Sequence, residues 1–401
     1  MSERIVSDPL APEPRTASDV AGPAEPDERH AATALPGRRP RMGTVVAVLL
    51  LAVALVLPYY VDKSWLRTGL FAFAAAVAAL GLSLLIGQAG QLSLGHSFFV
   101  AVGAYGYTFF AAEPTTVEGT RIGGLSLPPV LALILAVALA GLAGLAFSPI
   151  SSRLRGIYLG VASLGLVFGG LHILDNAEPL TGGAHGRDVP AFAVPGFTFD
   201  KVPGQTLEVL GVPFGKEEKL WYLALAMLVA GYLYHRGLVR SRPGRALRAV
   251  RDRDLMAGIL GVPVTRYKAS AFVVSSMYAG LGGVLFALVL GRIVPEAFGI
   301  TLAVEYLAMV VIGGAGSAAG AVAGAAFVTC LPRILDRYAG YLPGIASSSS
   351  TSDAGGLDPA VAAQFAYGAA LVLLLLVEPG GFAALGRRVL RRRRPRPASP
   401  R

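Results

Sequence analysis

The long apolar runs of this 401-residue chain are interrupted at two places. The first carries the polar side chains Gln88, Gln91, Ser93 and His96, and the second is a Gly-rich run with Gly313, Gly314, Gly316 and Ser317. Unpaired polar groups are costly in a hydrocarbon environment, so we expect the polar side chains to face protein or, with the Gly-rich run, to line a pathway for a polar solute. Hydrogen bonds that only fix helix packing would account for them equally well.

The two interruptions also resemble one another. Residues 86–90 read Ile, Gly, Gln, Ala, Gly, and residues 312–316 read Ile, Gly, Gly, Ala, Gly. Gly-interrupted apolar segments at corresponding positions of two halves indicate a transport pathway. In a sequence rich in Ala and Gly, the likeness is also compatible with chance.

A segment rich in arginine could bind another macromolecule. Residues 236–268 carry nine basic and two acidic residues, and the spacing predicts a short amphipathic helix over 245–257. Its apolar side would hold Leu247, Val250, Leu255 and Ile259, and its polar residues would be Arg245, Arg248, Arg251 and Asp252. Such a helix suits docking into a partner's groove or lying on anionic lipid, and periodicity does not decide between them.

Glu305 is the only acid well inside the apolar segment 298–331. An acid at membrane depth is a candidate for proton coupling. A position near a helix end at the outer interface explains it without any chemistry, and we adopt that interpretation.

Other chemistries find no support in the residue pattern. The one cysteine is Cys330, and the five histidines are scattered without ligand spacing. The run from Gly211 to Glu217 lacks the spacing and the hydroxyl of a phosphate-binding loop. We therefore expect no catalytic residue, no metal and no cofactor on this chain, which would not be an enzyme by itself.

Composition places these residues in a membrane. Apolar residues make up 54% of the chain and charged residues only 15%, against about a quarter in soluble proteins. Nine apolar stretches are span candidates: 43–60, 66–86, 94–112, 126–148, 157–175, 220–236, 269–290, 298–331 and 360–377. We expect 298–331 to form two short segments around the Gly-rich run, with one long tilted helix as the alternative. The expected fold is an all-α polytopic membrane protein with about ten membrane segments.

Basic residues cluster at the ends of the apolar stretches. The net charge of +10 could suggest a nucleic-acid partner, but its blocks at 38–41, 236–268 and 387–401 follow the positive-inside rule. We therefore expect a lipid bilayer as the surroundings, no nucleic acid, cytoplasmic termini and an extracytoplasmic loop at 176–219. The expected organisation is a disordered cytoplasmic tail (1–42), a transmembrane domain (43–379) and an Arg-rich cytoplasmic tail (380–401).

Several motifs together resemble those of LivM-type permeases of branched-chain amino acid ABC importers. They lie in the family's order at residues 87–105, 154–158, 180–186, 241–261 and 306–317. In the arginine-rich segment the matching residues are Ser241, Gly244, Arg245, Ala246, Leu247, Ala249, Arg251, Asp254, Ala257 and Gly261. Gly258 departs from the pattern, where an acid is common.

This resemblance implies a permease subunit in a bacterial cytoplasmic membrane that translocates branched-chain amino acids, a related amino acid or an amide such as urea. It implies coupling to an ATPase through residues 241–261, carried by Arg245, Leu247, Arg248, Arg251, Asp254, Ala257 and Gly261. It also implies a second, LivH-like permease, two cytoplasmic ATPase subunits that bind ATP and Mg²⁺, and an extracytoplasmic solute-binding protein. The alternative is a secondary transporter driven by an ion gradient.

Overall fold

A computed structural model describes residues 42–117, 120–154, 156–194, 196–200, 207–209, 212–338, 359–377 and 381–384. The chain divides into two units, 1–47 and 48–401. Of the first unit, only the start of α1 (Met42–Val56) is described, and the other elements belong to the second. The expected disordered N-terminal tail lies outside the described residues, as does the Arg-rich tail apart from residues 381–384.

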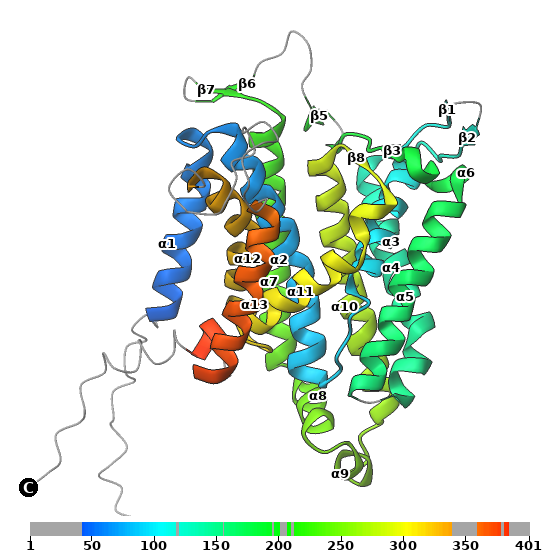
Figure 1. The fold of residues 1–401 in the computed structure, drawn as a ribbon, viewed down its shortest axis with the longest axis vertical. Coiled ribbons are helices and arrows are strands. Elements are labelled where there is room, and N and C mark those ends of the chain that lie inside the picture. Colours follow the sequence, from blue (N-terminus) through cyan, green and yellow to red (C-terminus); the bar gives the residue numbers. More distant parts are fainter. Residues whose placement is uncertain are drawn as a thin grey trace, which may run out of the picture. The chain divides into compact units, whose positions relative to one another are not determined.

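Helices form nearly all of the described regular structure (Figure 1). The longer ones are α2 (Lys63–Ala89), α3 (His96–Ala111), α4 (Pro129–Arg153), α5 (Ile157–Asn176), α7 (Lys216–Arg240), α10 (Val264–Leu290), α11 (Ile300–Gly313), α12 (Ala318–Tyr338) and α13 (Pro359–Val377). The shorter ones are η2 (Leu57–Tyr59), α6 (Glu178–Thr181), η3 (Gly183–His185), α8 (Arg242–Asp252), α9 (Asp254–Ile259) and η4 (Pro295–Phe298).

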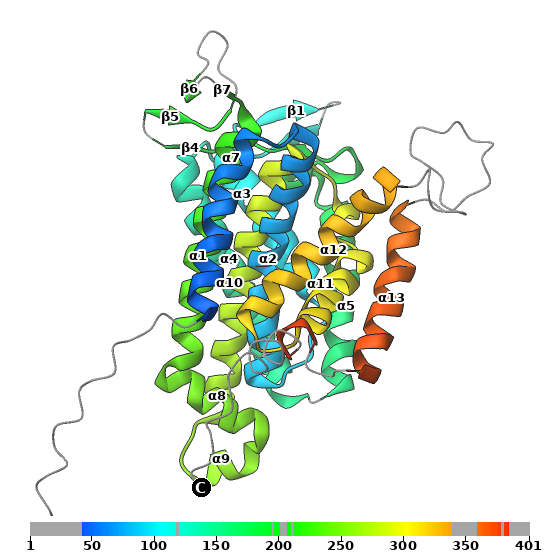
Figure 2. The same cartoon turned by 90° about the vertical axis from the view of Figure 1, so that its left-hand side faces the viewer.

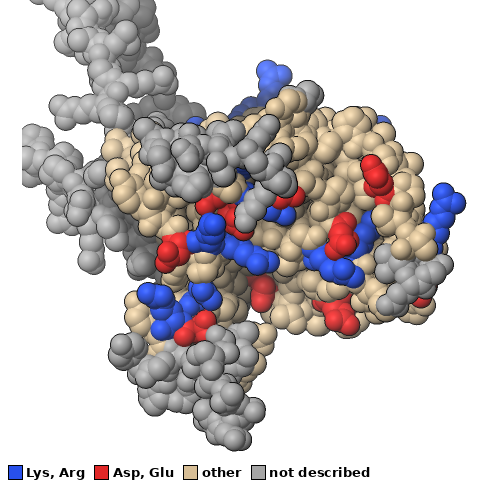
Figure 3. Space-filling model, turned by 90° about the horizontal axis from the view of Figure 1, so that it is seen from above, with Lys and Arg blue, Asp and Glu red and all other residues tan. Residues whose placement is uncertain are grey.

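Short antiparallel strand pairs complete the described structure. They are β1 (Thr115–Val117) with β2 (Thr120–Ile122), β3 (Arg187–Asp188) with β8 (Arg292–Ile293), β4 (Ala193–Val194) with β5 (Phe197–Thr198), and β6 (Leu207–Val209) with β7 (Val212–Phe214). These strands lie at one end of the helix bundle, the strand end, and α8 and α9 lie at the other, the α9 end (Figure 1). Acidic and basic side chains are interspersed on the strand end (Figure 3), where Arg292 Nη1 lies 3.3 Å from Asp188 Oδ1.

Among the described residues, seven helices are long and apolar enough to cross a membrane. They are α2, α4, α5, α7, α10, α11 together with η4, and α12. The prediction of an all-α polytopic membrane protein is thereby confirmed. The count of ten segments is not: α3, for example, has only 16 residues.

The helices α2 and α10 form the centre of the bundle (Figures 1 and 2). The spanning part of α2 is 78% buried and that of α10 is 61% buried, against 33% or less for α4, α5, α7 and α12. The close approach of α3 and α10 at this centre requires glycine. A Cβ on Gly103 of α3 would overlap the backbone of Gly280, and a Cβ on Gly283 of α10 would overlap the backbone of Val100. Small residues at helix contacts are typical of packing in lipid.

The structure breaks the chain at both Gly-rich interruptions, although not at every predicted residue. The helix α2 continues through Gly87 to Ala89 and is terminated by Gly90, whose φ of 67° suits glycine. Residues 90–95 are not helical, and α3 starts at His96. The helix α11 ends at Gly313, and Gly314 and Gly316 both have positive φ before α12 begins. The alternative of one long helix over 298–331 is therefore wrong.

Candidate coupling and translocation site

The helix α8 begins on a capped turn at the end of α7. The Ser241 hydroxyl accepts from the Gly244 N–H at 3.4 Å and donates to the Leu238 carbonyl at 2.6 Å, and Pro243 occupies the first turn. A Cβ on Gly244 would overlap the Leu238 carbonyl oxygen, so glycine is needed for α8 to turn back so closely on α7. This contact fixes the direction in which α8 leaves α7.

The predicted single helix over 245–257 is wrong. The helix α8 ends at Asp252, Arg253 is extended with φ −154° and ψ 91°, and α9 starts at Asp254. The predicted apolar side is divided accordingly. Leu247 and Val250 are buried, whereas Leu255 and Ile259 are 73% and 79% exposed.

Two arginines of α8 hold it to the end of α7. Arg245 Nη1 donates to the Arg240 carbonyl and Arg248 Nη1 to the Val239 carbonyl, each at 3.2 Å. The last carbonyls of a helix lack intrahelical donors and carry the negative end of the helix dipole, so guanidinium groups stabilise them.

Arg251 reaches a different helix. Its Nη1 donates to the Gly87 carbonyl in the last turn of α2 at 2.5 Å, and its Nε donates to Asp252 Oδ1 at 2.9 Å. The aliphatic part of the side chain lies over Gly90, where a Cβ would come within 2.7 Å of Arg251 Cγ. Arg251 therefore connects α8 directly to the end of the central helix α2.

The helix α9 is attached to the start of α10. Lys268 Nζ lies 3.3 Å from Asp254 Oδ2, and Lys268 itself is buried. Ala257 is buried, and its carbonyl accepts from the Val262 N–H. Gly261 has φ 80°, which lets the chain turn from α9 into α10. Asp254, Ala257 and Gly261 thus hold α9 in place.

An apolar surface on α9 points away from the rest of the protein, and its residues were not among those expected to carry the coupling. We call it the α9 surface; it consists of Leu255, Met256, Ile259 and Leu260, which are 52% to 83% exposed. Contiguous exposed apolar residues at the tip of a structure indicate a contact with another molecule. The four residues form an apolar cluster around Gly258 in the sequence and could have been recognised there. The predicted continuous helix instead placed Leu255 and Ile259 on one side with the buried Leu247 and Val250.

The two Gly-rich interruptions are in direct contact. A Cβ on Gly87 would overlap the backbone of Gly316, so these two residues touch through their main chains. Gln88 Nε2 donates to the Gly316 carbonyl at 3.3 Å, and the Gly316 N–H donates to Ser83 Oγ at 3.1 Å. Because Arg251 bonds to Gly87, the α8 helix reaches this contact through a single residue. Ser83 was not among the expected site residues.

The non-helical residues 90–95 and the following His96 are together anchored to three helices. Gln91 Nε2 donates to the Ser151 carbonyl of α4 at 3.2 Å, and the Leu94 N–H donates to Ser163 Oγ of α5 at 2.8 Å. His96 Nε2 lies 2.8 Å from the Ala78 carbonyl of α2. Ser93 Oγ accepts from the Gly95 N–H within the segment.

Each polar residue of the two interruptions therefore contacts protein. Gln88, Gln91, Ser93 and His96 are all buried, and Ser317 Oγ accepts from the Gly320 N–H at the start of α12. Gly313 packs against Gly320, where a Cβ would overlap the facing carbonyl. These contacts are what packing requires; a role in translocation remains a prediction.

Glu305 lies inside α11, not at its end. The helix starts at Ile300, and the candidate span that contains it starts at Pro295. Glu305 also lines a cavity of about 440 Å³ together with Tyr306. The expected position at a helix end is therefore wrong.

The chain has relatives among known transport proteins. Residues 65–377 match the family model for the permease component of branched-chain amino acid transport systems. The chain is 30% identical over 280 residues to LivM, a high-affinity branched-chain amino acid transport system permease protein of Salmonella typhimurium, which covers 67% of this chain and 63% of the relative. It thus spans less than two thirds of the length of this relative.

Two other relatives are more distant or shorter matches. LivH of Escherichia coli, a permease protein of the same kind of system, is 26% identical over 252 residues, or 62% of this chain and 77% of the relative. LsrC of Klebsiella pneumoniae, an autoinducer 2 import system permease protein, is 36% identical over 122 residues, which cover 29% of this chain and 34% of the relative. No solved structure matches the chain. The match over residues 65–377, which contains both interruptions and α8–α9, shows that the chain belongs to the family of permease components of branched-chain amino acid transport systems.

Proposed function

We propose that this chain is the permease subunit of an ATP-driven importer that moves branched-chain amino acids across a bacterial cytoplasmic membrane. Family membership and the similarity to LivM support this cargo. The similarity to LsrC, which serves autoinducer 2 import, is the reason that the cargo needs a direct measurement. A related amino acid, urea or a short amide are the other cargoes to be measured.

The proposed assembly contains several chains. Similarity to both LivM and LivH supports a second, LivH-like permease beside this one. Two cytoplasmic ATPase subunits would bind ATP and Mg²⁺, while this chain binds neither, and an extracytoplasmic solute-binding protein would deliver the cargo. The basic residues of α8 support a cytoplasmic α9 end, since basic residues favour that side. The strand end is then extracytoplasmic and both termini are cytoplasmic.

The contact between Arg251 and Gly87 carries the proposed coupling mechanism. The exposed α9 surface would dock into a groove of an ATPase subunit, as apolar faces of short helices do in other complexes. When ATP closes the ATPase pair, α8 and α9 would move with it. Arg251 would transmit that movement to the end of α2 and, through Gly87 and Gly316, to the break between α11 and α12. The resulting rearrangement would switch access from one side of the membrane to the other.

The experiment is ATP-dependent uptake of radiolabelled leucine into proteoliposomes that contain the whole transporter and its binding protein. The double variant L255S/I259S should lose co-purification with the ATPase subunits and lose uptake. Both side chains are exposed, so the melting temperature of the variant permease should stay that of the natural chain. Normal assembly and uptake in this variant would contradict docking through the α9 surface.

Glu305 inside α11 favours one second candidate, a secondary transporter driven by a proton gradient. The same proteoliposomes distinguish the two. Uptake that stops without ATP and is insensitive to a protonophore supports the importer. Uptake that continues without ATP and collapses with the proton gradient supports the secondary transporter.

A further inference from the structure

A cavity of about 440 Å³ lies between α2, α10, α11, α12 and α13. Its volume is within the usual range for small-molecule sites, about 300–1,000 Å³. On α2 it is lined by Thr68, Phe71 and Ala75, which belong to the half of that helix remote from α8. In the proposed orientation the cavity therefore lies in the outer half of the membrane domain.

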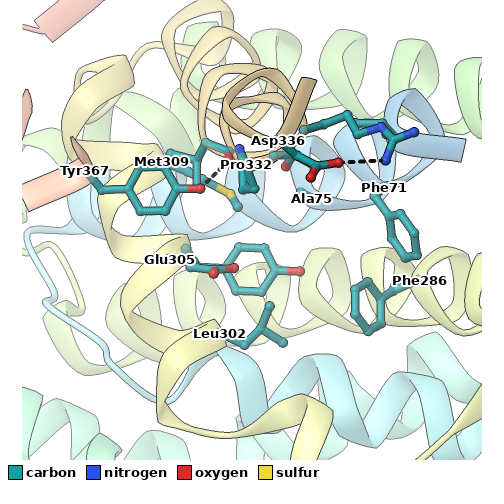
Figure 4. A pocket seen from close by; sticks show the side chains of 14 residues that line it. Phe71, Ala75, Phe286, Leu302, Glu305, Met309, Pro332, Asp336 and Tyr367 are labelled. Carbon is teal, nitrogen blue, oxygen red and sulfur yellow. Dashed lines mark hydrogen bonds and ion pairs between the residues drawn. The ribbon is translucent and has the colours of Figure 1, made fainter. Parts of the chain in front are cut away.

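One wall of this cavity carries a carboxylate. Glu305 of α11 is partly exposed, and its side chain points toward the middle of the cavity (Figure 4). Within the part of the chain that the structure describes, it has neither a hydrogen bond nor an ion pair. The neighbouring Tyr367 hydroxyl is already engaged, because it donates to the Val328 carbonyl at 2.6 Å. A carboxylate in such surroundings is suited to a cationic group on a ligand.

The opposite wall carries a guanidinium. Arg333 of α12 donates to Ser64 Oγ at 2.9 Å and lies 3.4 Å from Asp336 Oδ2. A guanidinium has five N–H donors, so these two contacts leave donors for a further acceptor. Arg333 lies close to the start of α2 and so near the strand end of the cavity.

Apolar side chains fill the space between the two charges. Phe71 and Phe286 pack edge to face with their ring centroids 5.5 Å apart, and Leu302 and Met309 complete this part of the lining (Figure 4). The cavity thus presents an acid, a base and an apolar surface to one ligand. That set matches a zwitterion with an aliphatic side chain.

We propose that this cavity binds the amino acid during its passage through the membrane. The Glu305 carboxylate holds the ammonium group, the Arg333 guanidinium holds the carboxylate, and Phe71 and Phe286 contact the aliphatic side chain. This assignment rests on the proposed function as an amino acid importer. It names a binding site for the cargo within the permease itself.

The cavity is also connected to the coupling contacts. Tyr306, which lines it, packs edge to face against the ring of His96 at the start of α3, with centroids 5.4 Å apart. His96 follows the non-helical residues 90–95, which follow the end of α2 that Arg251 contacts. About 18 Å of helix separates Ala75 from Gly87 at 1.5 Å per residue. A displacement of that end of α2 would therefore reach the cavity wall from two directions.

The test uses the whole transporter, with cysteine chemistry as a direct readout of binding. Thr329 lines the cavity, and replacing the one cysteine of this chain, Cys330, by serine leaves this chain without cysteine, so labelling is read on this subunit after separation from the others. In that background T329C should react with a maleimide. Leucine at about ten times its Kd should slow the reaction about tenfold, because only about a tenth of the sites stay free.

Two analogues and one variant pair assign the charges. Isocaproate, which lacks the ammonium group, and isoamylamine, which lacks the carboxylate, should protect T329C much less than leucine does. E305Q should weaken leucine binding and leucine uptake about tenfold, the loss expected for one charged hydrogen bond, so that the same leucine concentration slows the T329C reaction only about twofold, while binding-protein-stimulated ATP hydrolysis continues. The control is E296Q in η4, an exposed acid outside the cavity, which should behave as the natural chain.

Different results would overturn the two proposals. A natural transporter that shows no ATP-dependent leucine uptake contradicts the proposed function. A natural transporter that takes up leucine while T329C is unprotected and E305Q transports normally leaves the function standing and overturns the cavity site. Protection by leucine that is as strong in E305Q as in the natural chain, or full protection by isocaproate, overturns the role of Glu305.

Discussion

Arg251 of α8 donates a hydrogen bond of 2.5 Å to the carbonyl oxygen of Gly87, in the last turn of α2. The same Gly87 touches Gly316 in the break between α11 and α12. A surface helix, the central helix and a break in a third helix therefore meet at one glycine. A movement of α8 can therefore be passed to α2 and to the break between α11 and α12 through this glycine.

Replacing Arg251 by alanine should lower ATP-dependent uptake about tenfold, because a hydrogen bond to a charged group contributes about 1.5–3 kcal/mol. The accompanying contact with Asp252 is exposed and should contribute little. R251K should retain part of the activity, since an ammonium can still donate to one carbonyl. Uptake into proteoliposomes measures both.

The matched control for that substitution is R253A. Arg253 lies two residues further along and is exposed, and its replacement removes the same charge from the same segment. Uptake by R253A should be close to that of the natural chain. If R251A and R253A lose equal activity, general electrostatics and not the contact with Gly87 explains the loss.

Replacing Gly87 by alanine tests the contact between the two breaks. The new Cβ would overlap the Gly316 backbone, which cannot move away as a flexible side chain could, so the free energy of unfolding should fall by about 1–3 kcal/mol. Gly237 of α7 is the control, because a Cβ there meets nothing within 4 Å. G237A should be neutral or slightly stabilising, since alanine favours a helix.

Melting temperatures of the two purified variants in detergent measure the difference. G87A should melt several degrees below G237A. Its uptake in proteoliposomes should also be lower than that of G237A, because the contact between the two breaks is disturbed. Equal melting temperatures for G87A and G237A would show that the breaks can separate without loss of stability.

Part of this site could be predicted from sequence. The Gly-rich run at 313–317 predicted the break between α11 and α12 because two positions there have backbone angles that favour glycine. Ser241 and Gly244, two of the residues that match the family's motif, shape the turn into α8 through contacts with nearby residues. Local signals of this kind are contained within a few residues.

The rest depends on contacts between residues far apart in the chain. Gly87 and Gly316 are separated by more than two hundred residues, and no local pattern shows that they touch. The kink at Arg253 was missed because the apolar spacing of 247–259 fits one helix as well as two. The ion pair from Asp254 to Lys268, which holds α9 on α10, joins residues 14 positions apart and does not show in that spacing. Glu305 was likewise interpreted from its own segment, whereas its cavity is built from five helices.

The pair formed by Lys268 and Asp254 gives a further prediction about α9. Lys268 is only 7% exposed, and Asp254 Oδ2 lies 3.3 Å from its Nζ. D254N removes the charge that faces a buried ammonium, so the free energy of unfolding should fall by about 3 kcal/mol. The position of α9 should become less defined, and co-purification with the ATPase subunits should weaken.

The double variant D254N/K268M separates the ion pair from other effects of Asp254. Removing both charges leaves no buried unpaired ammonium, and methionine keeps much of the side-chain volume, so most of the lost stability should return. The measurements are the melting temperatures of the single and double variants and the amount of ATPase subunit that co-purifies with each. A double variant as unstable as D254N would mean that Asp254 stabilises α9 through contacts other than Lys268. Restored stability without restored co-purification would mean that the charge of this pair, and not only the position of α9, is needed for docking.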